Sequence, residues 1–125
     1  MGALSSLSRA SGVRYVEPNG TVHGTDSPND PYFPTYQWGP QRIGAPTAWD
    51  TTTGSASVIV AVLDTGLDMS HAEMTNGFVA GHDFVNADSD PADDHGHGTH
   101  VAGIVGAATN NGIGVASIGR ETRVM

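Results

Sequence analysis

Two short motifs bring an acid and a base into settings suited to hydrolytic chemistry. Asp64-Thr65-Gly66 directly follows six apolar residues, Val58–Leu63. A carboxylate at that point is costly unless it is hydrogen-bonded or functional. Further along, His97 stands between two glycines in His95-Gly96-His97-Gly98-Thr99-His100. Glycines beside it let the backbone pack closely and leave the ring facing a cleft. An aspartate that orients a histidine makes two of the three members of a serine-protease triad.

The element that carries Asp64 is expected to be a buried strand. Val58–Leu63 is a continuous apolar run, as is typical of a parallel strand covered on both faces. In an open α/β sheet, the carboxyl end of such a strand is where chemistry is done. A second, shorter strand is expected over Phe78–Val85. Thr122–Met125 resembles the beginning of another strand.

The element that carries His97 is expected to continue as a buried helix over Gly98–Thr109, since apolar residues lie nearly all round it. Ile43–Asp50 predicts a short helix that tolerates Pro46 near its start. Residues 25–40 are rich in Asp, Asn, Pro and aromatics, which favours an extended segment with little helix. Two or three strands do not cover a helix without a polar face, so we expect more of the sheet to lie beyond Met125.

Composition limits the partners of the chain. Its 125 residues are enough for one domain, and 13 acidic against 5 basic residues give a net charge of −8. This balance argues against nucleic acid and anionic membranes as partners and suits the binding of cations. The sequence has no cysteine, which excludes disulfides and thiol chemistry, and it has no run of 18 apolar residues.

Three motifs in order resemble the subtilisin-like serine peptidases (subtilases), most closely their thermitase-like branch. They are Asp64-Thr65-Gly66, His97-Gly98-Thr99-His100 and Asn110-Asn111-Gly112-Ile113-Gly114-Val115. The resemblance runs from about Asn29 to Met125. It implies an α/β fold, the N-terminal part of a subtilisin-like parallel-sheet, three-layer domain that is incomplete in this chain and occupies residues 25–125.

The resemblance also implies an activity, hydrolysis of peptide bonds in proteins or peptides by an Asp-His-Ser triad. Asp64 would hold the imidazole tautomer and stabilise the imidazolium, and His97 would be the general base. No serine of the chain lies in the family's serine motif, and the oxyanion-hole asparagine also falls outside the sequence. We therefore expect this chain to be inactive alone. The alternative is a catalytically inactive calcium-binding fragment or pseudo-peptidase.

Structural calcium is the cofactor that the resemblance implies. The expected ligands of one site are carboxylates, an amide and backbone carbonyls, from Asp30, Glu73, Asn111, Ile113 and Val115, with one carbonyl from Ala108 or Thr109. Glu73 replaces the aspartate more usual in the family. A second, weaker site would use Asp83, Asn86 and Asp88. The simpler interpretations are an Asn-Gly turn that closes a helix and a solvated acidic loop.

The first residues, 1–24, are expected to be the end of an inhibitory propeptide and a linker. Val13-Arg14-Tyr15-Val16-Glu17-Pro18 resembles the last propeptide strand that precedes many subtilases, so the chain's own propeptide would be an inhibitor. The alternative is a plain strand followed by a turn at Asn19-Gly20. Secretion is implied by the family, although Met1–Leu4 lacks the pattern of a signal peptide.

Two other enzyme classes share parts of this pattern. Asp-Thr-Gly also occurs in aspartic peptidases, where two such aspartates share a proton, but the histidine motif and its helix are unexpected there. His95, His97 and His100 suggest zinc, yet the spacing lacks a His-Glu-x-x-His pattern and a better-spaced ligand set.

Overall fold

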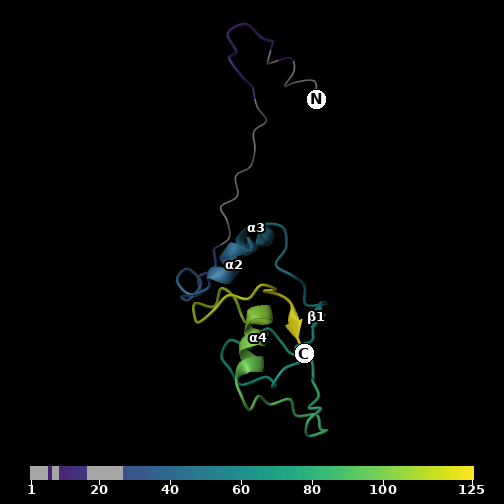
Figure 1. The fold of residues 1–125 in the computed structure, drawn as a ribbon. Coiled ribbons are helices and arrows are strands. Elements are labelled where there is room, and N and C mark those ends of the chain that lie inside the picture. The colour runs from purple at the N-terminus through teal and green to yellow at the C-terminus, as the bar shows by residue number, and fades with distance from the viewer. Residues whose placement is uncertain (1–5, 7–8, 17–26) are drawn as a thin grey trace.

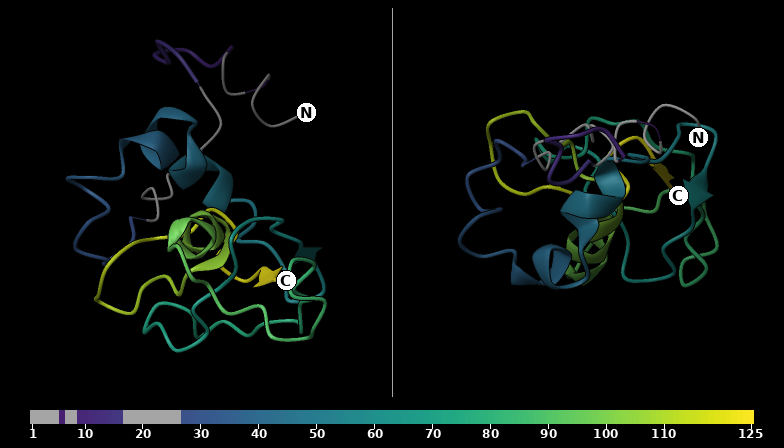
Figure 2. Two further views of the ribbon diagram at one scale, coloured as in Figure 1. Left: turned by 60° about the horizontal axis from the view of Figure 1, so that its bottom comes forward. Right: turned by 90° about the horizontal axis from the view of Figure 1, so that it is seen from above.

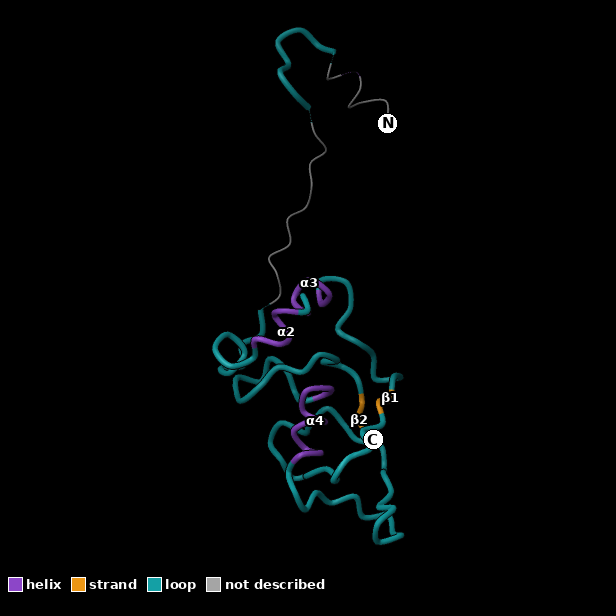
Figure 3. Tube along the Cα trace, in the orientation of Figure 1, coloured by secondary structure: helices purple, strands orange, loops and turns teal. Residues whose placement is uncertain are grey.

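Loops and turns make up most of the chain and surround one central helix. The computed structural model describes residues 6, 9–16 and 27–125. In chain order, the elements are α2 (Trp38–Arg42), α3 (Ala45–Trp49), β1 (Ile59–Val60), α4 (His97–Gly106) and β2 (Arg123–Val124). Figure 1 shows α4 beside β2, and Figure 3 shows how short the regular elements are. Among the described helices, none has the length and apolar character needed to cross a membrane.

The two strands form a small parallel sheet. Ile59 pairs with Arg123 and Val60 with Val124, and a single parallel bridge joins Phe78 to Val124. The strand expected near Thr122 is therefore confirmed. The strand expected over Val58–Leu63 is regular at only two residues. None of its side chains is fully buried: Val62 packs partly against the core, whereas Leu63 is 87% exposed. In the described part of the chain β1 is hydrogen-bonded on one edge only, so the continuous burial expected of a parallel strand is not reached.

The second strand expected, Phe78–Val85, is wrong beyond its first residue. At the end of this segment, the backbone N–H groups are hydrogen-bonded to a side-chain carboxylate and not to a neighbouring strand. Asp83 Oδ1 accepts hydrogen bonds from the N–H groups of Val85 (2.7 Å) and Asn86 (3.0 Å). Short polar side chains compete with ladder pairing in this way and favour turns. The segment therefore closes on itself as a tight turn, with an antiparallel bridge between Asp83 and Asp88.

Two short helices stand at the start of the described domain. The helix expected over Ile43–Asp50 is confirmed as α3, with Pro46 in its first turn. The preceding α2 lies partly in the segment expected to be extended, so that expectation is wrong from Trp38 onward. Trp49 of α3 is buried, and its ring centroid lies 5.8 Å from that of Phe33. Its Nε1 donates to the carbonyl of Ile118 (2.9 Å), which ties α3 to the C-terminal loop.

The central helix α4 packs through its smallest residues. Its buried positions are Gly98, Ala102, Gly103 and Gly106, and Ala102 joins a cluster with Leu67, Met74 and Val124. Ile104 on the other side is 47% exposed, so burial on several sides is not complete. In the left view of Figure 2, α4 is seen nearly end-on with loops around it.

The first turn of α4 lies against the backbone of the segment that follows β1. A Cβ added to Gly98 would overlap the carbonyl oxygen of Gly66 and lie 2.8 Å from its nitrogen. The Gly98 N–H donates to the Thr65 hydroxyl (2.9 Å). A residue with any side chain at position 98 would push the two segments apart, and with them the residues on either side.

One carboxylate organises the loop that leads into α4. Asp93 Oδ1 accepts from the N–H groups of His95 (3.0 Å) and Gly96 (2.8 Å), and Oδ2 accepts from the N–H (2.9 Å) and the hydroxyl of Thr99. The Thr99 hydroxyl is the largest cause that holds the pKa of Asp93 far below its ordinary value, and the backbone N–H groups add to it.

Substitution of Gly98 by alanine should destabilise the fold, because the added methyl group has no space against Gly66. We expect a loss of about 1–3 kcal/mol, the usual cost of overpacking. Thermal melts of the full-length gene product would measure it. The control is Gly39→Ala in α2, where a Cβ meets nothing within 4 Å. Alanine is the better helix former there. Equal melting temperatures for the two variants would contradict the close approach of the two segments.

Acid should destabilise the protein partly through Asp93. The unfolded chain takes up this proton near pH 3.8, whereas the folded chain keeps the carboxylate charged to lower pH. Its contribution is therefore complete above pH 3.8 and is lost as the pH falls through the lower folded-state pKa. Asp93→Asn should show a smaller fall of melting temperature on acidification than the wild type. The matched control is Asp94→Asn, which removes a charge from the exposed neighbour, and equal acid profiles for both variants would contradict the prediction.

Candidate active site

Asp64 and His97 meet in the folded chain. His97 Nδ1 lies 2.6 Å from Asp64 Oδ1, within hydrogen-bond distance. His97 is the first residue of α4, and Asp64 lies four residues after the end of β1. The His97 side chain is 59% exposed and that of Asp64 only 16%. The structure therefore brings together the two residues that the sequence singled out, with the acid shielded behind the ring.

The electrostatics of the pair suit a charged acid beside a proton-accepting ring. The hydrogen bond from His97 is the largest cause that lowers the pKa of Asp64 below 3.8, followed by the N–H of Thr65, which donates to Oδ1 at 2.8 Å. Asp64 is therefore ionised at neutral pH. Because Asp64 occupies Nδ1, Nε2 is the ring nitrogen left to exchange a proton with another group.

The two other enzyme classes lose support here. The partner of Asp64 is a histidine rather than a second aspartate, unlike the shared-proton pair of an aspartic peptidase. His95 lies edge-on to His97, with ring centroids 6.5 Å apart. Within residues 6, 9–16 and 27–125, no three His, Asp or Glu side chains gather as a metal site.

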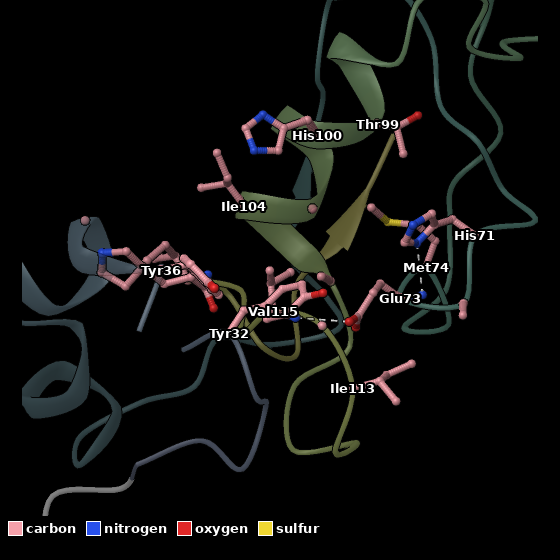
Figure 4. A pocket seen from close by; sticks show the side chains of 18 of the residues that line it. Tyr32, Tyr36, His71, Glu73, Met74, Thr99, His100, Ile104, Ile113 and Val115 are labelled. Carbon is pink, nitrogen blue, oxygen red and sulfur yellow. Dashed lines mark hydrogen bonds between the residues drawn. The ribbon is translucent and has the colours of Figure 1, made fainter. Parts of the chain in front are cut away.

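An apolar groove of about 1350 Å³ runs beside this pair, along α4. It reaches Gly96 and Thr99, the neighbours of His97, and extends past His100 and Ile104 to Tyr36. Figure 4 shows the His100 and Ile104 side chains on the groove side of α4, with Tyr36 across from them. The groove thus begins at residues on either side of His97, although neither Asp64 nor His97 itself lines it.

The candidate calcium ligands gather at the opposite end of α4 from His97. Asp30 is 1% exposed and Glu73 5% exposed. Asp30 Oδ2 accepts from the N–H of Asn110 (2.9 Å), and Glu73 Oε2 accepts from the Asn111 side-chain amide (3.1 Å). Glu73 Oε1 accepts from the N–H of Val115 (3.0 Å), as Figure 4 shows. The structure therefore places both acids and the loop Asn110–Val115 together, including Ile113.

The chemistry of these residues fits a hard cation. Burial of a charged carboxylate is costly without a partner, yet in the described part of the chain neither Asp30 nor Glu73 forms an ion pair. Carboxylates, an amide oxygen and backbone carbonyls are the ligands that calcium prefers. A Cβ at Gly114 would overlap the Glu73 carboxylate, so glycine is what lets the loop approach this acid.

The three residues of the second candidate calcium site also lie together, in the turn described above. Asp83 Oδ2 accepts from the side-chain amide of Asn86 (2.8 Å), and Asp88 Oδ1 accepts from the N–H of Asp90 (2.9 Å). Hydrogen bonds from Asn86, first from its backbone and then from its side chain, lower the pKa of Asp83. These bonds account for the turn without a metal, so the second site stays a prediction. The strand expected in the propeptide motif is not formed at residues 13–16, which have no regular structure, and Glu17 and Pro18 lie outside the described residues.

Two residues near the pair are not distinguished by the sequence pattern. Thr65 and Asp93 are hydrogen-bonded to each other, with the Thr65 hydroxyl donating to Asp93 Oδ1 at 2.8 Å. The sequence marks Thr65 only as part of a sharp turn and Asp93 only as part of an acidic loop. No pattern separates Asp93 from the adjacent Asp94. The spacing of four residues between Asp93 and His97 is the one signal that could connect this acid with the helix start.

Comparison with known proteins covers the segment that holds this pair. The profile of the subtilase family matches residues 55–124. A thermophilic serine proteinase of Bacillus sp. (strain AK1) is 45% identical over 113 residues, 90% of this chain and 28% of the relative. Thermitase of Thermoactinomyces vulgaris is 46% identical over 99 residues, 79% of this chain and 35% of the relative. The chain thus spans about a third or less of the length of these two relatives.

A solved structure gives the same result at the level of the fold. A protease from Pseudoalteromonas arctica PAMC 21717 superposes with a TM-score of 0.70 and 36% identity, over 79% of this chain and 38% of that chain. The parallel pair β1–β2 with its helices is consistent with a part of that subtilisin-like α/β fold. From the family match over residues 55–124 and these serine protease relatives, we conclude that the chain belongs to the subtilase family, with thermitase among its relatives.

Proposed function

We propose that the protein containing this chain is a subtilisin-like serine endopeptidase to which the chain contributes Asp64 and His97. The observation that carries this proposal is the 2.6 Å contact between Asp64 Oδ1 and His97 Nδ1 beside an open apolar groove. Proteins or peptides are the proposed substrates. The nucleophilic serine and the oxyanion donor would come from outside residues 1–125, so this stretch of the protein would be inactive by itself.

In the proposed mechanism, each member of the pair has one task. Asp64 stays ionised, keeps the proton of His97 on Nδ1 and fixes the plane of the ring. Nε2 is then free to take the proton of the serine hydroxyl as that oxygen attacks the substrate carbonyl. The same nitrogen returns the proton to the leaving amine, and Asp64 stabilises the imidazolium between the two steps.

The proposed pair can be tested by substitution in the full-length gene product, with casein and a chromogenic peptide as substrates. Asp64→Asn keeps the size of the side chain but favours the wrong tautomer, so kcat should fall by about 10⁴-fold. His97→Ala should reduce kcat at least as much. His82→Ala, which removes an exposed imidazole that meets the Phe84 ring edge to face, is the control and should keep full activity.

The outcomes separate this proposal from its alternative. A folded gene product that binds calcium but hydrolyses neither substrate would favour the inactive calcium-binding protein or pseudo-peptidase. Hydrolysis that survives both Asp64→Asn and His97→Ala would assign the activity to other residues.

We further propose that the loop Asn110–Val115 holds a structural calcium ion with Asp30 and Glu73. Support comes from the two buried carboxylates without an ion pair and from the oxygen-rich loop between them. The ligands would be these two side chains, the Asn111 amide oxygen and the carbonyls of Ile113 and Val115. The ion would supply positive charge to a buried acidic site and fix the loop at the end of α4.

Calcium should therefore raise the melting temperature of the protein. An ion that binds only the folded state stabilises it by about 2.7 kcal/mol at 100 times its Kd. Titration calorimetry and melts with and without a chelator would measure this for the wild type, Asp30→Ala and Asn111→Ala. Asp50→Ala, an exposed acid at the end of α3, is the control. Unchanged calcium binding in both loop variants would refute the assigned ligands and leave the acidic turn at Asp83 as the candidate.

Inhibition by the protein's own propeptide and secretion from the cell are further parts of this proposal. Both rest on the family resemblance of the sequence. The acidic composition supports the absence of nucleic acid and anionic membranes among the proposed partners.

A further inference from the structure

The Asp64–His97 pair is backed by a second carboxylate that the proposed mechanism does not use. Asp93 is half-buried between the segment that carries Asp64 and the loop that precedes His97. Its two oxygens accept five hydrogen bonds from four residues, which are Thr65, His95, Gly96 and Thr99. Every one of these residues lies within two positions of Asp64 or His97.

A continuous chain of hydrogen bonds leads from Asp93 to the imidazole. Asp93 Oδ1 accepts from the Thr65 hydroxyl (2.8 Å), and the Thr65 N–H donates to Asp64 Oδ1 (2.8 Å). That same Asp64 oxygen contacts His97 Nδ1 (2.6 Å). The Thr65 hydroxyl also accepts from the N–H of Gly98, so it is held from both sides of the pair.

Thr99 makes a second connection between the same two segments. Its hydroxyl donates to Asp93 Oδ2 and accepts from the N–H of Asp68 (2.9 Å). The hydroxyl groups of Thr65 and Thr99 therefore each accept a hydrogen bond from a backbone N–H of the opposite segment, and each donates a hydrogen bond to Asp93. Asp93 is the shared acceptor that sets the direction of both hydroxyl groups.

From this arrangement we infer that Asp93 is a positioning residue for the reaction, which holds Asp64 and His97 at their working separation through Thr65 and Thr99. The inference rests on the proposed peptidase function and adds a second acid to the site, one that touches neither substrate nor the imidazole. It also predicts that the Thr65 hydroxyl is needed for catalysis, and not only for the sharp turn that follows Asp64.

A carboxylate is required at this position because all the groups around it are donors. Five N–H and O–H groups point at its two oxygens, and both oxygens are acceptors only when the side chain is an ionised carboxylate. Asparagine has one acceptor oxygen, and its amide would direct N–H groups at the N–H and hydroxyl of Thr99. Asp93→Asn should therefore release one side of the network while it nearly preserves volume.

The test is steady-state kinetics of the full-length gene product with a chromogenic peptide, well below the melting temperature of each variant. We expect Asp93→Asn to lower kcat by about 10–100-fold with little change in KM, as a displaced catalytic group does. Asp94→Asn, which removes the neighbouring exposed charge, is the matched control and should keep the wild-type kcat. Thr65→Val should lower kcat like Asp93→Asn, and Thr65→Ser, which restores the hydroxyl, should recover it.

Each outcome decides between positioning, folding and the function itself. This inference alone would be overturned if Asp93→Asn had the same kinetics as Asp94→Asn while Asp64→Asn still abolished the activity. Equal losses in Thr65→Val and Thr65→Ser would also overturn it, because they would exclude the hydroxyl. If Asp93→Asn and Thr65→Val fail to fold while Asp94→Asn folds, the network serves folding and the inference is wrong. No hydrolysis in the wild type, or hydrolysis indifferent to Asp64→Asn, would refute the proposed function and this inference together.

Discussion

The site depends on one close approach between two stretches of backbone. The first turn of α4 and the segment that follows β1 lie so near each other that position 98 has no space for a Cβ. This proximity is what allows an aspartate and a histidine 33 residues apart to meet at 2.6 Å. At the other end of α4 a second small residue allows a different close contact, with β2: a Cβ on Gly106 would lie 2.7 Å from Val124 Cγ2. The position of the helix is therefore set by its smallest residues, which are the ones buried against the rest of the chain.

The far end of α4 is fixed by polar groups in addition to this close packing. The Asn76 side-chain amide donates to the carbonyls of Gly106, Ala107 and Arg120, so a single residue satisfies the helix end and the turn before β2. The N–H of Ala108 donates to the carbonyl of Glu73 (2.7 Å), whose side chain reaches the loop Asn110–Val115. Orphan carbonyls at a helix end need such partners. The candidate calcium ligand Asn111 follows three residues after Ala108, so the loop starts directly from this fixed end of the helix.

The sequence predicted the pair but not its supports, for reasons that differ from residue to residue. Asp64 and His97 stand in unusual local contexts, one after an apolar run and one between glycines. Asp93 stands beside an identical residue, and only its partners in three dimensions distinguish it from Asp94. Helix α2 was missed because Trp38-Gly39-Pro40 combines residues that favour turns, although proline is well tolerated in a first helical turn. The strands were predicted too long, since their lengths depend on neighbours that a sequence pattern does not contain. The acid at position 30 was connected with residues 110 and 111 through family resemblance, because no local rule relates positions 80 residues apart.

That long separation has a consequence for how the molecule is assembled. Asn29 and Asp30 are hydrogen-bonded to Asn110, Asn111 and Gly112, and Gln37 is hydrogen-bonded to Ala116, so the first part of the described domain closes over the last. Contacts between distant positions require the entropy of a long loop to be lost before any of them contributes. The segment around Asp30 must find a loop some 80 residues later in the chain, so this closure adds contacts of the non-local kind that slow folding.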